Sequence, residues 1–194
     1  MNPYVSFGLA MCGIVGISLF LTAYMAVIFN RRAKSDLLES LRPLAILMDG
    51  DVDLDDARAA GRYKGHIATG RAANAPQGLG RIFLTSVIDG AGGKPWTYTA
   101  RRPKEADRAV DVSMIGPNET SNESLQESIG RIALPLLAAP GWLKIDYDPT
   151  TGHVQLTRRM ETRRDIPAPD TFITYLEALV AIAGINRESQ HPEP

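Results

Sequence analysis

The strongest hydropathy feature of the chain is an uncharged, mostly apolar run from Tyr4 to Phe29. As an α-helix, these 26 residues would measure roughly 39 Å, which exceeds the roughly 30 Å hydrocarbon core of a bilayer. No Lys or Arg precedes the run and no small-residue cleavage pattern follows it, which argues against a signal peptide. The pattern predicts a membrane-spanning helix within residues 1–30.

A second helical pattern follows directly and makes residues 31–48 a juxtamembrane segment. Ser35 has the character of an N-cap and Gly50 that of a helix stop, while Pro43 is expected to bend or divide the helix. The apolar residues at helical spacing are Leu37, Leu38, Leu41, Leu44, Ala45 and Met48.

The middle of the chain alternates between apolar and polar residues in the manner of β-strands. Residues 81–89 and 94–102 flank the turn-forming "GAGG", which predicts one hairpin; residues 142–148 and 153–159 flank "PTTG", which predicts another. Shorter strands are expected at 63–69 and 109–114. The residues predicted to face the core are Trp96, Tyr98, Ala100, Leu143, Ile145, Tyr147, Val154 and Leu156.

Two helical patterns accompany these strands. Residues 121–141 read as a helix, with Ser124 and Glu127 at capping-box spacing. A last helix is expected to begin near Asp170 and to stop near Gly184. It is too short to cross a bilayer and apolar enough to be buried in the fold.

This order of elements predicts an α+β fold: a single N-terminal transmembrane helix followed by one compact domain with a mainly antiparallel sheet and about three helices. The α+β domain is expected over residues 49–186, and a polar tail at 187–194. The first 34 residues hold three cations and no anion, which leaves 18 cations against 22 anions in the remainder, a formal net charge of −4. That balance argues against nucleic acid as a partner.

The charges beside the apolar run predict its orientation. Arg31, Arg32 and Lys34 follow the run at its C-terminal end, whereas no charged side chain precedes it. Because positive residues favour the cytoplasmic side, we expect a single-pass protein of the bacterial inner (cytoplasmic) membrane, with its N-terminus outside and its domain in the cytoplasm.

Candidate chemistry is sparse. The acidic stretch Asp49–Asp56 supplies weak metal-ligand candidates in Asp49, Asp51 and Asp53, but it lacks the glycine and glutamate of an EF-hand loop. The three histidines are isolated, and the single cysteine lies in the apolar run. We therefore expect no enzyme activity, no cofactor and no identifiable small-molecule substrate. A second basic stretch, with Arg158, Arg159, Arg163 and Arg164, is interpreted as solvated charge at a strand end; the alternatives are that it faces the membrane or an acidic partner.

The apolar run itself carries the more informative pattern. Gly8, Cys12 and Gly16 recur every four residues, and Ala23 falls close to the same face. Small side chains let a second helix approach closely in lipid. The leading hypothesis is a non-catalytic accessory or assembly subunit of a bacterial membrane complex, such as an energy-transducing one, whose partners are membrane protein subunits and the bilayer. The alternatives are a membrane-tethered metal-dependent enzyme or sensor using the Asp49–Asp56 loop, and a binder of anionic lipid surfaces.

Overall fold

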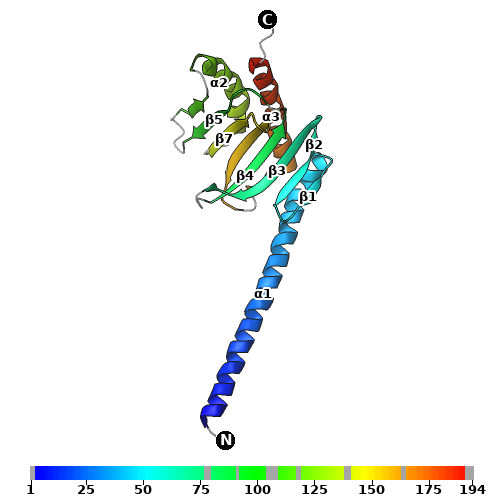
Figure 1. Cartoon of the computed structure of the whole chain (residues 1–194), viewed down its shortest axis with the longest axis vertical. Helices are drawn as coiled ribbons and strands as arrows, with labels where there is room; N and C mark the ends of the chain where they lie inside the picture. The colour runs from blue at the N-terminus through cyan, green and yellow to red at the C-terminus, as the bar shows by residue number, and fades with distance from the viewer. Residues whose placement is uncertain are drawn as a thin grey trace. The chain divides into compact units, whose positions relative to one another are not determined.

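The structure, a computed structural model, describes residues 3–76, 80–90, 92–103, 109–116, 119–137, 141–162 and 165–190 (Figure 1). The chain divides into two compact units, Met1–Glu39 and Ser40–Pro194. The segment predicted as juxtamembrane is thus shared between the units, because residues 40–47 belong to the second.

A single continuous helix, α1 (Pro3–Leu47), holds both of the predicted N-terminal helices. The predicted N-cap at Ser35 is wrong, since the helix runs through it, and Pro43 does not divide the helix. From Met11 onward α1 is long and apolar enough to cross a membrane, with a mean hydropathy of 2.2 and no buried side chain in its most apolar window. Among the described residues it is the one helix with these properties.

The second unit is built on one antiparallel sheet of eight strands in the order β1-β2-β3-β4-β8-β7-β5-β6 (Figure 1). Two helices, α2 (Glu119–Ala133) and α3 (Pro169–Gln190), pack against each other and against the sheet. This architecture confirms the predicted α+β class. The strands are β1 (Asp51–Asp53), β2 (Arg58–Tyr63), β3 (His66–Asn74), β4 (Arg81–Ile88), β5 (Trp96–Arg102), β6 (Asp111–Ile115), β7 (Gly141–Asp148) and β8 (His153–Met160).

The core lies between the helices and one face of the sheet. Strand alternation places Tyr98, Ile145 and Leu156 side by side on this face, and each is at most 1% exposed. Phe172 of α3 packs edge-on against Phe83 of β4, with ring centroids 6.2 Å apart. All eight predicted core residues of β5, β7 and β8 are buried, as expected. The last helix is also buried along one side, which confirms that expectation.

The predicted hairpin across "GAGG" is wrong. Strand β4 pairs with β3 and β8, whereas β5 pairs with β6 and β7, so β8 and β7 lie between the two predicted partners. The predicted β7–β8 hairpin is confirmed. The predicted strand at 63–69 is wrong as a single strand: it covers the last residue of β2 and the start of β3, and Lys64 and Gly65 between them form the turn of a β2–β3 hairpin with positive φ angles of 48° and 87°. The predicted strand at 109–114 corresponds to β6.

Helix boundaries differ from the expected ones. Helix α2 begins at Glu119, so Ser124 lies inside it and is no N-cap, and a short 3₁₀ helix, η2 (Leu134–Leu136), follows it at Pro135. Helix α3 continues past Gly184 to Gln190. Asn186 explains this continuation: its Oδ1 accepts a hydrogen bond of 2.8 Å from Nε1 of buried Trp96.

The end of α1 is part of the second unit's core. Leu41, Leu44 and Met48 are fully buried, and the carbonyl oxygen of Met48 accepts a hydrogen bond from the backbone nitrogen of Arg62 in β2. A Cβ atom at Gly61 would lie 2.3 Å from that Met48 oxygen, so glycine is required for this close approach.

Candidate functional site

The predicted docking face lies on the exposed surface of α1. Successive residues of an α-helix turn by about 100°, which places Gly8, Cys12, Gly16 and Ala23 within an arc of about 80°. Cys12, Gly16 and Ala23 are exposed, and a Cβ atom added at Gly16 would meet nothing within 4 Å. The small-residue face is therefore exposed at these three positions. Arg31, Arg32 and Lys34 follow it on the same helix and are exposed.

The acidic stretch after α1 folds into a tight turn. Oδ1 of Asp53 accepts hydrogen bonds from the backbone nitrogens of Asp55, at 3.1 Å, and Asp56, at 3.3 Å. Oδ2 of Asp53 lies 3.7 Å from a guanidinium nitrogen of Arg58. The carboxylate of Asp53 thus caps a turn and pairs with a cation of its own hairpin.

The other weak metal candidates, Asp49 and Asp51, do not complete a ligand set with Asp53. Asp51 lies in β1 with its side chain exposed, and Asp49 takes a left-handed turn conformation with φ of 48°. Within the described part of the chain, no three Asp, Glu, His or Cys side chains gather in a way that could hold a metal ion. The structure does not bring Asp49, Asp51 and Asp53 together as a ligand set.

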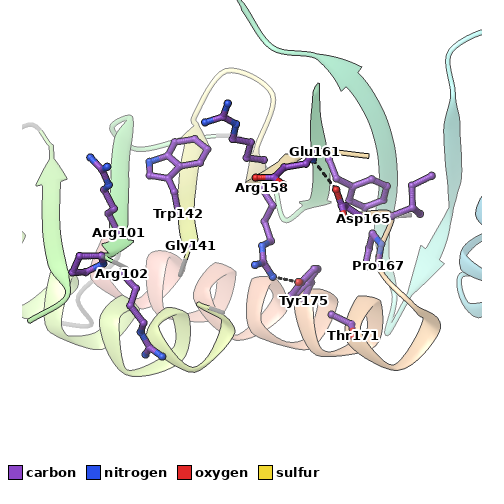
Figure 2. A pocket seen from close by; sticks show the side chains of 14 residues that line it. Arg101, Arg102, Gly141, Trp142, Arg158, Glu161, Asp165, Pro167, Thr171 and Tyr175 are labelled. Atoms are coloured by element: carbon purple, nitrogen blue, oxygen red, sulfur yellow. Dashed lines mark hydrogen bonds between the residues drawn. The ribbon is translucent and has the colours of Figure 1, made fainter. Parts of the chain in front are cut away.

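A cavity of about 620 Å³ opens where β5, β7 and β8 meet the start of α3 (Figure 2). Strand β5 contributes Arg101 and Arg102 at its C-terminal end, and β8 contributes Arg158 and Arg159 at its own. Because β7 lies between these strands, two arginine pairs 56 residues apart in sequence come to the same end of the sheet.

Strand alternation sends the arginines of each pair to opposite faces. Figure 2 shows the side chains of Arg102 and Arg158 turned toward the helices, while Arg101 points the other way. Gly141, which pairs with Arg102 at the start of β7, carries no side chain and so leaves room on this side of the sheet.

Arg158 is the best-held cation of the cavity. It is partly buried, and its Nη1 donates hydrogen bonds to the Tyr175 hydroxyl and, at 3.4 Å, to the carbonyl oxygen of Leu136. Its guanidinium carbon also lies 5.4 Å from the centroid of the Tyr175 ring. All of these partners are neutral.

Two acidic residues, Glu161 and Asp165, line the cavity. Oδ2 of Asp165 accepts hydrogen bonds from the backbone nitrogens of Thr162, at 2.6 Å, and Glu161, at 2.7 Å. These two bonds hold the pKa of Asp165 below its usual value, and the bond from Thr162 has the larger effect. The Asp165 carboxylate is thus engaged in shaping its own loop (Figure 2).

Charge pairing sets this cavity apart from other charged surfaces of the domain. Asp89, whose side chain is 8% exposed, is paired with Arg187 and lies 3.3 Å from Nδ1 of His66. Lys64 pairs with Glu177 at 2.9 Å. By contrast, among the residues that the structure describes, none of the four cavity arginines has a carboxylate within 4 Å. Asp170 and Arg158 line a smaller neighbouring hollow without forming a salt bridge.

Of the two arginine pairs that line this cavity, only Arg158 and Arg159 were identified from the sequence. Arg158 and Arg159 were noticed as part of a basic stretch, whereas Arg163 and Arg164 of that stretch lie outside the described residues. The doublet Arg101–Arg102 at a strand end was the available signal for the other half. Its meaning depends on β7 lying between β5 and β8, which the predicted hairpin did not contain.

Comparison with known protein families, with curated proteins and with solved structures found no match to this chain. A function for it therefore has to be argued from its own residues and their geometry.

Proposed function

We propose that the chain is a non-catalytic accessory or assembly subunit of a bacterial membrane protein complex, with energy-transducing complexes as one candidate class. In this proposal α1 anchors the protein in the inner membrane and docks on helices of neighbouring subunits. The second unit covers the cytoplasmic face of the complex.

The observation that carries the proposal is the exposed, apolar surface of α1. A helix of this hydropathy with unburied side chains is stable in lipid or against other apolar helices. Small residues gathered on one face favour the second environment, because helix association in lipid depends on close packing rather than on hydrophobicity. The cations that follow the run support the proposed orientation.

The test is co-purification from native membranes in a mild detergent. Ala23→Leu, which adds bulk to the small-residue face, is expected to reduce the recovery of partner subunits. Ala10→Leu is the matched control, because Ala10 lies about 140° around the helix from Ala23. A wild-type protein that is recovered alone and monomeric would contradict the proposal, as would equal losses in the two variants.

Calorimetric titration with Ca²⁺ and Mg²⁺ tests the metal-dependent alternative. We expect no binding, because the Asp53 carboxylate is engaged in turn capping and in a pair with Arg58. Binding that disappears in both Asp51→Ala and Asp53→Ala would replace the accessory-subunit proposal with a metal-dependent sensor or enzyme.

A further inference from the structure

We propose that the cavity between Arg102 and Arg158 binds an organic phosphate monoester, with the two guanidinium groups on its phosphate and the apolar wall on its organic part. The cavity lies entirely within the second unit, so this inference stands independently of the proposed membrane role.

The first argument is the missing counter-charge of Arg158. Charged side chains that leave bulk water are normally paired, since desolvation of an unpaired ion is costly. Arg158 is partly buried, yet its hydrogen-bond partners among the described residues are the Tyr175 hydroxyl and a backbone carbonyl, both neutral. These contacts fix the direction of the guanidinium group without neutralising it. An anionic ligand would supply the negative charge that the described residues do not place beside Arg158.

The second argument is geometric. Arg102 and Arg158 come from β5 and β8, and Gly141 of β7, which pairs with Arg102, adds no side chain of its own to the cavity. Figure 2 shows both arginine side chains turned toward the helix side of the sheet. A guanidinium group presents a planar fork of N–H donors that matches phosphate oxygens. Arg102 and Arg158 bring two such forks to the lining of one cavity from different strands.

The third argument is the charge balance, which selects a dianion. Arg102 and Arg158 bring a formal charge of +2 to the helix side of the sheet, whereas Arg101 points to the other face and the Asp165 carboxylate is engaged with the backbone of its own loop. A phosphate monoester carries about −1.5 to −2 charges near neutral pH, whereas a single carboxylate or a phosphodiester carries one. The monoester therefore comes closest to neutralising the cavity.

The fourth argument is size and lining. At about 620 Å³ the cavity falls within the range of about 300–1,000 Å³ that is typical of small-molecule sites, and it greatly exceeds the volume of a phosphate ion. Ile166, Pro167 and Pro103 add apolar surface beside the arginines. That surface fits the organic part of an ester, which can come from a soluble metabolite or from the glycerol phosphate of a monoester lipid.

The test is isothermal titration of the full-length protein in a non-ionic detergent, with phenyl phosphate as the probe and phenyl sulfate as its monoanionic match. We expect phenyl phosphate to bind, and phenyl sulfate to bind at least tenfold more weakly. Arg158→Met and Arg102→Met are each expected to weaken binding by about tenfold to a hundredfold, the loss expected for a charge-assisted hydrogen bond. Arg131→Met is the matched control, because Arg131 pairs with Glu127 on α2 outside this cavity.

Tyr175→Phe keeps the ring and removes the hydroxyl that orients Arg158, so it keeps the test valid if an arginine variant fails to fold. It is expected to weaken binding by about threefold to tenfold. Glycerol 3-phosphate and dihexanoyl phosphatidate, both used as monomers, distinguish the two sources. Equal affinity for the two supports a soluble ester, and at least tenfold tighter binding of the phosphatidate supports a lipid.

Three results would overturn the inference: no binding of any phosphate monoester, equal binding of phenyl sulfate and phenyl phosphate, or affinities unchanged in Arg102→Met, Arg158→Met and Tyr175→Phe. Loss of phosphate binding would leave the co-purification of partner subunits unaffected, so failure of this inference and failure of the accessory-subunit proposal are distinguishable.

Discussion

The buried hydrogen bond between Trp96 and Asn186 gives a stringent test of how α3 is held on the sheet. The two residues are 4% and 5% exposed, and the indole nitrogen lies 2.8 Å from Asn186 Oδ1. The indole also stacks on the Tyr147 ring, with centroids 6.0 Å apart. Because of this stacking, the indole cannot turn its N–H toward water without losing a second contact.

Asn186→Leu removes the acceptor and leaves the buried indole N–H of Trp96 without this hydrogen bond. An unsatisfied buried donor costs about 1–3 kcal/mol, and at the size of this domain each kcal/mol shifts the Tm by about 2–4 °C. Trp96→Phe removes the indole donor from the Asn186 oxygen. The double variant removes donor and acceptor together, so its loss of stability should fall short of the sum of the single losses by at least about 1 kcal/mol.

Unfolding of the full-length protein in mild detergent, followed by near-UV circular dichroism, measures these four stabilities. The near-UV signal reports on the packed aromatic side chains of the domain, and the three variants and the wild type form a double-mutant cycle. Single losses that add to the double loss within about 0.5 kcal/mol would refute the reasoning, because the two side chains would then be energetically independent.

Three further predictions use the same unfolding assay. The buried Tyr98 hydroxyl has no hydrogen-bond partner among the described residues, so Tyr98→Phe should leave stability unchanged or raise it by up to about 1 kcal/mol; a larger loss would reveal a partner. Gly61→Ala should lower the free energy of unfolding by about 1–3 kcal/mol or more, because its Cβ would clash with the Met48 carbonyl. Gly184→Ala has free space around its Cβ and should raise the free energy of unfolding by about 0.5–1 kcal/mol. The opposite order of the two stabilities would contradict the packing. Hydrogen bonds from the Thr151 hydroxyl and, second, from the Thr150 backbone nitrogen hold the pKa of Asp148 below its usual 3.8. The stabilising contribution of Asp148 is therefore complete above pH 3.8 and is lost as the pH falls through the lowered pKa. Asp148→Asn should make the stability of the protein less dependent on pH in this acidic range, and an unchanged pH dependence would refute this.

Local patterns in the sequence predicted the parts of the fold that depend on neighbouring residues. The β7–β8 hairpin was predicted correctly because a four-residue connection joins two strands whose alternation agrees, with Ile145 opposite Leu156. The α+β class and the buried faces of these strands follow from the same alternation.

Long-range pairing could not be predicted in this way. The glycine-rich turn after β4 indicates a change of direction, but it does not say which strand lies beside β4, and β8 takes that place over eight residue pairs. Helix ends were missed for a related reason. Gly184 resembles a stop signal, yet tertiary contacts such as the Asn186–Trp96 bond extend α3 beyond it.

The cavity depends on the same long-range pairing. Arg102 and Arg158 come to one end of the sheet because β7 pairs with both β5 and β8. From the sequence alone, each arginine is a charge at the end of a strand. The unpaired guanidinium of Arg158 becomes meaningful only once its neutral partners are known.

The central claim is that α1 crosses the membrane with the N-terminus outside and the domain in the cytoplasm. The single cysteine, Cys12, makes thiol labelling the most direct measurement, because Cys12→Ser provides a cysteine-free chain. New cysteines are then placed at Asn2 or at Thr150, and intact spheroplasts are treated with a membrane-impermeant maleimide. We expect labelling at position 2 in intact spheroplasts and at position 150 only after lysis. Labelling at position 150 in intact spheroplasts, or release of the protein by carbonate washing, would contradict it.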